Sequence, residues 1–383
     1  MITLEPKEYF SVLIPDGESP FALDVLKCLS QIKNVRTYVL SNDVWAQSRF
    51  SRYSTQFFSY SKANGNEGQL AAIYDTIKKT KVDVVLPVDE HTIHLLSRHS
   101  EILSELTSIA PLPKTDVFET ALNKWLLAEW LKKNHFPYPP TILYQTNNNF
   151  DKSLSCISFP VLIKPILGGN GEGIKLFENK ATLYSFCKEH ISSEKYIIQS
   201  FIRGYDIDCS VLCQQGKILA YTIQKGFING PSRFSPPSGI DMLYDRNVSD
   251  LVAKVVDKFN WTGVAHFDLR YDEQDKQIKV IEMNPRFWGS VLGSLSAGVN
   301  FPYLACLTGL KRDLPNIVFQ PKRFVKGKIA LKILALRMRQ RNRRDIYFDD
   351  SPIPFLLKDP LPKVIELYSK FHHKVFHKRQ RQT

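Results

Sequence analysis

The first 110 residues alternate short apolar segments with amphipathic ones, and this alternation constrains the fold more than any other feature. The apolar segments have the length of strands, and apolar residues recur between them at helical spacing. Such alternation is typical of a doubly wound parallel sheet with helices on both faces. The expected strands are residues 11–14, 35–40, 82–88 and 108–110, and the expected helices are residues 20–32, 68–79 and 91–98. We therefore predict an α/β domain over residues 1–110.

The pattern changes after residue 110. Pro111-Leu112-Pro113 interrupts the alternation, and residues 114–134 are predicted to form one long helix. From residue 141 to about residue 310 strands predominate, which indicates an α+β region. Two hairpins are expected there, one pairing residues 206–213 with 217–224 and the other pairing residues 263–271 with 277–283. We expect a second domain over residues 111–310 and an extension over residues 311–383.

The net charge of +13 lies entirely in that extension. Residues 311–383 contain 19 Lys and Arg against 6 Asp and Glu, whereas basic and acidic residues are equal in number over residues 1–310. Residues 324–344 have the pattern of a basic amphipathic helix. Such a helix either meets an anionic membrane surface or a polyanionic substrate, or docks on the body with its basic face in water. Aromatic residues do not interleave with the charges, so a nucleic-acid partner is not expected.

Several classes of protein are not indicated by the sequence. No run of about 18 uncharged apolar residues occurs, so no membrane-spanning helix is expected. The first residues lack the pattern of a signal peptide, and the six cysteines are scattered without a disulfide framework or zinc-site spacing. We expect a cytoplasmic protein, with a peripheral position at the inner face of the membrane as the alternative if the extension is an anchor.

An apolar strand over residues 159–163 leads to Lys164, and a glycine-rich loop follows it. The glycines of this loop are Gly168, Gly169, Gly171 and Gly173. Glycine leaves the backbone bare, so its amide groups can approach phosphate oxygens, and the lysine adds a positive charge. The loop is not a Walker loop, because no Gly-Lys-Ser/Thr opens a helix after it. We interpret it as a nucleotide-phosphate site, with an ordinary turn as the alternative.

Two neighbouring strands carry residues of the kind that binds divalent metals. Asp268 lies on the strand expected over residues 265–270, and Glu282 and Asn284 lie on or just beyond the strand expected over residues 279–283. If the strands pair, these three oxygen donors converge, and magnesium prefers such ligands. The alternative, carboxylates in solvent on a hairpin, does not explain why Glu282 interrupts an apolar run.

Three other polar residues have two interpretations each. Asp89 and Glu90 follow an expected strand, where ligand groups gather in open sheets, but an acidic pair also suits the start of a helix. His266 lies two residues before Asp268 and either faces the same site or packs in the core.

Together these segments resemble the ATP-grasp superfamily, particularly the carboxylate-amine ligase branch that includes carbamoyl-phosphate synthetase and D-alanine–D-alanine ligase domains. The resemblance covers about residues 1–310, and Glu282-Met283-Asn284-Pro285-Arg286 is close to the family's Glu-x-Asn-Pro-Arg signature. It implies a Rossmann-like α/β domain followed by an α+β ATP-grasp fold, whose two subdomains clasp ATP about a hinge near residues 199–206. A basic C-terminal helical tail would follow.

The resemblance implies a nucleotide-binding role for several residues. Lys124 and Lys164 would contact the ATP phosphates, and the loop 168–173 would fold over them. Asp206 would receive the ribose hydroxyls. The hinge residues that would hold the adenine are Gln199, Ser200, Phe201 and Ile202. The family commonly has Glu where this chain has Gln199 and Asp206, which puts in doubt the strength of adenine binding and the direct reach to the ribose.

The resemblance also implies the residues of the chemistry. Asp268, Glu282 and Asn284 would hold one or two magnesium ions, with manganese as the alternative metal. Arg286 would stabilise the acyl phosphate. The remaining candidates, for contact with phosphate or the substrate carboxylate, are Lys225 and Arg233.

The implied reaction is an ATP- and magnesium-dependent ligation of a carboxylate to an amine through an acyl phosphate, with release of ADP and phosphate. Both substrates are expected to be small molecules. An ATP-grasp phosphotransferase and a non-catalytic ATP-binding module are the alternatives, and a homodimer is an open alternative for the oligomeric state.

Overall fold

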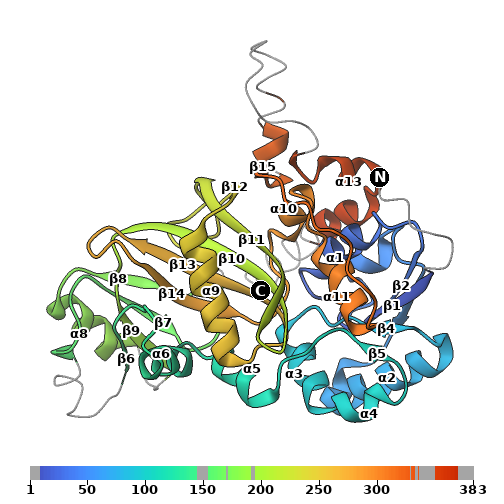
Figure 1. The fold of residues 1–383 in the computed structure, drawn as a ribbon, viewed down its shortest axis with the longest axis horizontal. Helices are drawn as coiled ribbons and strands as arrows, with labels where there is room; N and C mark the ends of the chain where they lie inside the picture. The colour runs from blue at the N-terminus through green and yellow to red at the C-terminus, as the bar shows by residue number, and fades with distance from the viewer. Residues whose placement is uncertain are drawn as a thin grey trace, which may run out of the picture.

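The computed structural model describes residues 9–144, 154–169, 171–190, 195–327, 329–332, 335 and 350–369. The described strands form a parallel sheet of five strands, an antiparallel sheet of four and an antiparallel sheet of six. Figure 1 shows the parallel sheet on one side of the molecule and the two antiparallel sheets on the other.

The parallel sheet is built from the first 110 residues in the order β3-β2-β1-β4-β5. Its elements are β1 (Phe10–Ile14), α1 (Ala22–Leu29), β2 (Val35–Ser41), β3 (Gln56–Ser59), α2 (Gly65–Thr80), β4 (Val84–Val85), α3 (Glu90–Arg98), α4 (Ser100–Ser104) and β5 (Ser108–Ile109). Val12, Leu13 and Ile14 are fully buried, because a central parallel strand is covered on both faces. The predicted alternation is present. β3 was not predicted, because its four residues are exposed or half-buried and form no apolar run.

The segment predicted as one long helix is two helices, α5 (Thr115–Leu122) and α6 (Lys124–Lys133). The break lies at Asn123, whose backbone is extended and whose side chain accepts hydrogen bonds from the amides of Trp125 and Leu126. Asparagine competes with the helix for backbone groups in this way and favours the N-cap position. The cap makes Lys124 the first residue of α6.

The four-stranded sheet has the order β6-β9-β7-β8. Its elements are β6 (Thr141–Leu143), β7 (Val161–Pro165), β8 (Lys175–Phe177), α8 (Lys180–His190) and β9 (Tyr196–Ser200). Val161 and Ile163 of β7 pack with Leu183 of α8 in a core of their own. Lys164, between these inward positions and the loop, points to the other face of the sheet.

The six-stranded sheet has the order β14-β13-β10-β11-β12-β15 and contains both predicted hairpins. Its elements are β10 (Gly204–Gln214), β11 (Lys217–Ile228), β12 (Gly239–Leu243), α9 (Arg246–Phe259), β13 (Gly263–Asp272), β14 (Ile278–Asn284) and β15 (Lys322–Val325). α9 lies across one face, where Val252 and Val256 pack with Ile207 and Phe267 (Figure 1). The opposite face is left for the site.

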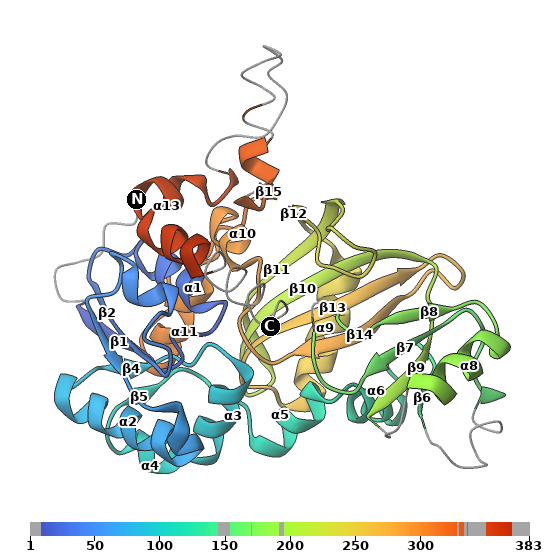
Figure 2. The same ribbon diagram turned by 180° about the vertical axis from the view of Figure 1, so that it is seen from behind.

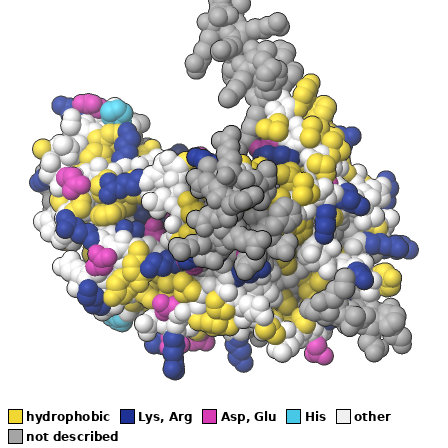
Figure 3. Space-filling view, turned by 90° about the horizontal axis from the view of Figure 1, so that it is seen from above, with side chains coloured by type: hydrophobic (Ala, Val, Ile, Leu, Met, Phe, Trp, Pro, Cys, Tyr) yellow, Lys and Arg dark blue, Asp and Glu magenta, His cyan; other side chains and the backbone are white. Residues whose placement is uncertain are grey.

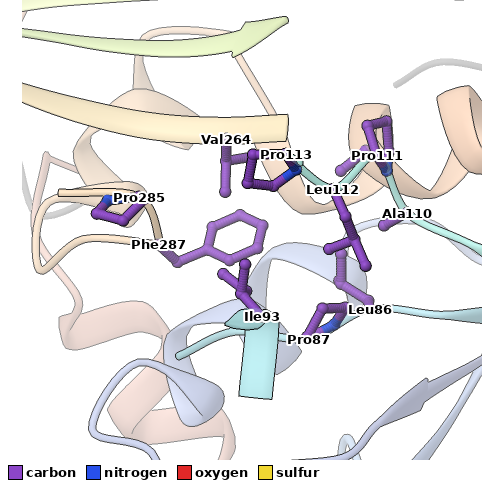
Figure 4. A pocket seen from close by; sticks show the side chains of 11 residues that line it. Leu86, Pro87, Ile93, Ala110, Pro111, Leu112, Pro113, Val264, Pro285 and Phe287 are labelled. Carbon is purple, nitrogen blue, oxygen red and sulfur yellow. The ribbon is translucent and has the colours of Figure 1, made fainter. Parts of the chain in front are cut away.

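One apolar core joins the parallel sheet to the six-stranded sheet. It contains residues of β1 and α1 together with residues of α10 (Val291–Ser296) and α11 (Phe301–Gly309), which contact α1. Where the linker crosses, Pro111, Pro113, Val264 and Phe287 line an apolar cavity of about 10 Å³ (Figure 4). This space holds about one water molecule. The two regions are therefore closely packed.

The chain after residue 310 continues into the folded body. Phe324 and Val325 of β15 are buried and pair with Ile240 and Gly239, so the helix predicted over residues 324–344 does not begin at residue 324. Residues 327, 329–332 and 335 are helical, and residues 328, 333–334 and 336–344 of the predicted helix lie outside the described part of the chain. Residues after 310 thus add a strand to the six-stranded sheet.

Residues 350–359 dock on the parallel-sheet region. In this segment, which includes α13 (Ile353–Lys358), the Asp359 carboxylate accepts hydrogen bonds from the Ser51 hydroxyl at 2.5 Å and the Arg52 amide at 3.1 Å. Asp350 pairs with Lys322 at 2.6 Å.

Seen from above, the described Lys and Arg side chains are scattered among other side chains rather than gathered in one patch (Figure 3). Within the described residues, no helix has the length and apolar character needed to cross a membrane.

Candidate functional site

A cavity of about 430 Å³ lies between the four-stranded and six-stranded sheets. Figure 2 shows the ribbons of these two sheets from behind. β7 and β9 line one side, and strands β10 to β14 line the other. The predicted site residues that line it are Lys164, Gly169, Gly171, Gln199, Ser200, Phe201, Ile202, Asp206, Arg233, His266, Asp268, Glu282, Asn284 and Arg286. Segments more than 100 residues apart in the sequence therefore meet at one cavity.

Lys164 is buried and makes no ion pair with a described residue. Its ammonium donates a hydrogen bond to Gln199 Oε1 at 2.8 Å, and the Gln199 amide donates to the Thr141 hydroxyl at 2.9 Å. Burial lowers the pKa of Lys164 to about 8, and the charge of Glu282 opposes this shift. A glutamate in place of Gln199 would neutralise this lysine, so the amide leaves its charge available to an anionic ligand.

Lys124 reaches the same region from the start of α6. Its ammonium lies 3.0 Å from Glu282 Oε1 and donates a hydrogen bond to the Gly168 carbonyl. The Asn123 cap sets this position, because it fixes where α6 begins. Lys124 and Gly168 do not line the cavity themselves, and neither does Gly173.

The paired strands β13 and β14 bring the three predicted metal ligands together. Asp268 is opposite Glu282 in the register, His266 is opposite Asn284, and the Asn284 amide lies 3.4 Å from Asp268 Oδ2. Burial, with the charges of Asp208 and Glu282, raises the pKa of Asp268 well above its usual value. A bound cation would offset this repulsion, and two carboxylates with an amide oxygen are donors that suit magnesium.

His266 packs beside this group and contacts it. Its Nε2 lies 3.3 Å from Asp268 Oδ1, its Nδ1 lies 2.8 Å from the Ser210 hydroxyl, and its ring stacks on Trp288. Burial lowers the pKa of His266 to about 3, with smaller effects of the Arg286 and Lys326 charges. Both interpretations of this residue therefore hold: it is packed, and it faces the site.

Sequence reasoning missed Asp208. It faces Asp268 across β10 and β13, and Asp208, His266 and Asp268 offer ligand atoms within 4.8 Å of one another. The Gln224 amide donates to Asp208 at 3.0 Å, and burial raises the pKa of Asp208 to about 7. Strand alternation could have revealed it, because polar residues 206, 208 and 210 share one face while residues 207, 209 and 211 enter the core.

Arg286 is held in place by the parallel-sheet region. Its Nε donates to Glu90 Oε1 at 2.7 Å, its Nη2 donates to Asn284 Oδ1 at 3.2 Å, and its guanidinium lies 4.6 Å from the Phe21 ring centre. Burial raises the pKa of Glu90, and the charge of Arg286 opposes the shift. Glu90 therefore orients the arginine. Asp89 caps α3 through the Glu90 amide.

The hinge is tied to β13 by Arg270, which sequence reasoning also missed. Its guanidinium donates to the Ile202 carbonyl at 2.7 Å and the Gly204 carbonyl at 2.8 Å, and it forms an ion pair with Asp206. It also lies 5.2 Å from the Phe201 ring centre. No sequence motif signals this residue, because its partners lie more than 60 positions away.

The glycine loop crosses the cavity. A Cβ at Gly169 would lie 3.5 Å from Arg286 Nη2, and a Cβ at Gly171 would lie 2.1 Å from the Phe234 carbonyl oxygen. Gly171 also has a φ of +76°, which side chains rarely tolerate. Arg233, beside Phe234, lies 5.4 Å from the Phe201 ring centre. The loop and residues 233–237 therefore meet over the site.

The structure does not bring Lys225 to the cavity. Its ammonium lies 3.4 Å from the Tyr205 ring centre, and Lys225 pairs with Ile207 in the register. Its neighbour Gln224 lines the cavity, and successive side chains of a strand point to opposite faces. Lys225 was expected to contact phosphate or substrate, but its side chain lies on the face of β11 that points away from the cavity.

Comparison with known proteins gives one family match. Residues 121–290 match the family described as "ATP-grasp domain". D-aspartate ligase of Enterococcus faecium is 23% identical in an alignment of 229 residues that covers 54% of this chain and 54% of the ligase. The chain thus spans about half the length of this curated relative.

Two solved structures share the fold. N5-carboxyaminoimidazole synthetase from Staphylococcus aureus, complexed with ADP, has a TM-score of 0.65 at 16% identity, over 88% of this chain and 87% of that one. The biotin carboxylase domain of Hydrogenobacter thermophilus 2-oxoglutarate carboxylase, in complex with MgADP, ADP and bicarbonate, has a TM-score of 0.63 at 17% identity, over 82% and 74%. Likeness at such low identity establishes the fold alone.

Proposed function

We propose, from the premise that residues 121–290 are an ATP-grasp domain, that this chain is an ATP- and magnesium-dependent ligase that joins a carboxylate to an amine. The observation that carries the proposal is the convergence of a lysine, three oxygen donors and an arginine at one cavity, with a second lysine paired to one of these donors. These residues are Lys124, Lys164, Asp268, Glu282, Asn284 and Arg286. A module that only binds ATP has no use for the arginine beside the metal donors, so the full set favours catalysis.

The nucleotide would lie at the hinge end of the cavity. Lys164 would exchange its bond to Gln199 for a phosphate oxygen, and Lys124 would contribute a second charge near Glu282. Phe201 and the backbone of the hinge would hold the adenine, and Asp206 would accept from the ribose. The glycine loop would cover the phosphates with its amides and exclude water.

Asp268, Glu282 and Asn284 would hold magnesium, or manganese in its place. A metal ion at these residues supplies neutralisation of charge on the phosphate oxygens. The residues of the chain supply the rest: Glu90 orients Arg286, whose guanidinium lies beside Asn284 and stabilises negative charge there.

The reaction has two steps. A carboxylate oxygen attacks the γ-phosphorus of ATP, the bond to the β-phosphate oxygen breaks, and ADP leaves. The amine nitrogen then attacks the carbonyl carbon of the acyl phosphate, the bond to the phosphate oxygen breaks, and the nitrogen loses a proton. Arg286 faces both anionic species, and positioning with charge neutralisation supplies the catalysis.

The test is a measurement of products over a panel of carboxylates and amines with MgATP. We expect ADP and phosphate in equal amounts, and a hydroxamate when hydroxylamine replaces the amine. A phosphotransferase would release ADP without free phosphate, and a binding module would release neither. AMP and pyrophosphate would contradict the acyl-phosphate route.

The organisation of the chain belongs to the same proposal. We propose a Rossmann-like domain before the ATP-grasp domain, with its boundary near residue 110. The homodimer and the attachment of the basic extension to an anionic surface remain predictions.

A further inference from the structure

Lys326 enters the cavity from the edge of the six-stranded sheet opposite β14. It follows β15 directly, and its amide donates to the Ser238 carbonyl at 2.9 Å, which continues the strand pairing. Its side chain lines the cavity together with Gln224, Ile240 and Trp288. The sequence pattern had placed this lysine on the basic face of an amphipathic helix.

The ammonium of Lys326 has no hydrogen-bond or ion-pair partner among the residues that the structure describes. The other cations that line the cavity each have contacts: Lys164 with Gln199, Arg270 with Asp206, Arg286 with Glu90, and Arg233 with the rings of Phe201 and Phe234. Lys326 is the exception within the described part of the chain.

The acidic groups near Lys326 are already bonded elsewhere. Asp24 and Asp208 act on its charge, but both lie beyond ion-pair distance from it. Asp24 pairs with Lys27 at 2.8 Å, and Asp208 accepts from Gln224 at 3.0 Å. Burial lowers the pKa of Lys326, as expected for a cation withdrawn from water without a counterion.

Lys326 also lies away from the metal donors of β14. It follows β15, which forms the opposite edge of the six-stranded sheet from β14, the strand that carries Glu282 and Asn284. Near this end, a Cβ at Gly289 would meet nothing within 4 Å, so open space remains beside Trp288.

We propose that Lys326 binds an anionic group, a carboxylate or a phosphate, of the substrate that is not the nucleotide. The inference rests on the proposed function, because it assumes that the nucleotide occupies the hinge end. Lys326 is half-buried, and a cation partly withdrawn from water without a partner is costly, so an anionic group of the substrate would supply that partner. Lys326 then selects substrates that carry an anionic group besides the atoms that react.

The experiment uses the full chain with its nucleotide site filled by magnesium and a non-hydrolysable ATP analogue. Inorganic phosphate and succinate are titrated separately against sodium chloride at equal ionic strength, and the dissociation constant is obtained from the shift in unfolding temperature. We expect one of the two anions to stabilise the wild-type protein, which identifies the anion as phosphate or carboxylate. Lys326→Met should raise that dissociation constant about 10- to 100-fold, and Lys326→Arg should restore most of the affinity.

Lys332→Met is the matched control, because Lys332 is exposed and lies six positions further along the chain. It should behave as wild type. Equal anion affinity in Lys326→Met and wild type, or no stabilisation of the wild type by either anion, would overturn the inference. Absence of a shift with the ATP analogue itself would overturn the proposed function instead, and the anion titration without nucleotide would then still decide on Lys326.

Discussion

The two ends of the cavity differ in how their charged groups are satisfied. At the hinge end the side chains bond to one another, as Lys164 does with Gln199 and Arg270 does with Asp206. At the other end Lys326 has no such bond to a described residue. A ligand at the hinge end must exchange existing hydrogen bonds, which changes the free energy little for each bond. A ligand at Lys326 supplies a partner that this half-buried ammonium lacks among the described residues, so it binds without displacing an existing hydrogen bond.

The largest effect is expected from removing the charge at the hinge end. Lys164→Met should lower ADP release about 10²- to 10³-fold, because the lysine stabilises charge that develops on the phosphates. Circular dichroism should show an intact fold. Lys332→Met serves as the control in the same assay, and turnover of Lys164→Met close to that of the control would contradict the assignment.

The stability of the same variant should depend on pH. The pKa of Lys164 is about 8 in the fold and 10.5 ordinarily, so the unfolded chain binds more protons between these values and wild-type stability rises with pH there. Lys164→Met lacks the ionisable group, so this pH-dependent contribution to its stability is absent. It should exceed wild type in free energy of unfolding by up to about 3 kcal/mol below pH 8, and the difference should vanish toward pH 10.5.

Urea unfolding at pH 7.5 and pH 10 measures this difference. If the difference in free energy of unfolding between Lys164→Met and wild type stays constant with pH, burial does not penalise the charge of Lys164. The contrast drawn between the charged groups at the two ends of the cavity would then be wrong.

A smaller effect is expected from breaking the ion pair between Glu90 of the parallel-sheet region and Arg286 at the cavity. Glu90→Gln removes the ion pair that orients Arg286 but keeps the shape of the side chain. We expect kcat to fall about 10- to 100-fold, since a hydrogen bond to a charged group is worth about 1.5–3 kcal/mol. The KM for ATP should not change, because Glu90 lies away from the hinge. A change in KM alone would place Arg286 with the nucleotide.

The smallest effect is expected at the start of α6. Asn123→Ala removes the cap and should lower the free energy of unfolding by about 1 kcal/mol. Asn123→Asp keeps an acceptor and is the matched control. Loss of activity without loss of stability in Asn123→Ala would show that the cap acts mainly by positioning Lys124.

Features that depend on local pattern could be predicted from the sequence. The central strands of the parallel sheet are apolar runs, and the loop after Lys164 is recognisable from its glycines. The convergence of Asp268 and Glu282 followed from one short hairpin, because two strands joined by a turn have few registers. Asp208 could have been added by the same alternation.

Features that depend on distant pairing could not be predicted. Residues 322–325 form a strand only because β12 offers an edge to them, and nothing in their own pattern says so. Because the sequence predicted a helix over residues 324–344, the position of Lys326 at the cavity could not be predicted. The expected contact of Lys225 came from the resemblance alone, and the alternation along β11 turns its side chain to Tyr205 instead of the cavity. Arg270 and Glu90 acquire their roles from partners far along the chain.

The shared core of α1, α10 and α11 has a consequence for synthesis. The parallel sheet is made first, but the helices that cover one side of its core come from residues 291–309. At about 5–20 residues per second, some 10–40 s separate the emergence of residue 110 from that of residue 300. The first part of the chain to leave the ribosome therefore waits longest for the helices that complete its core. During that interval its apolar face is exposed and prone to aggregation.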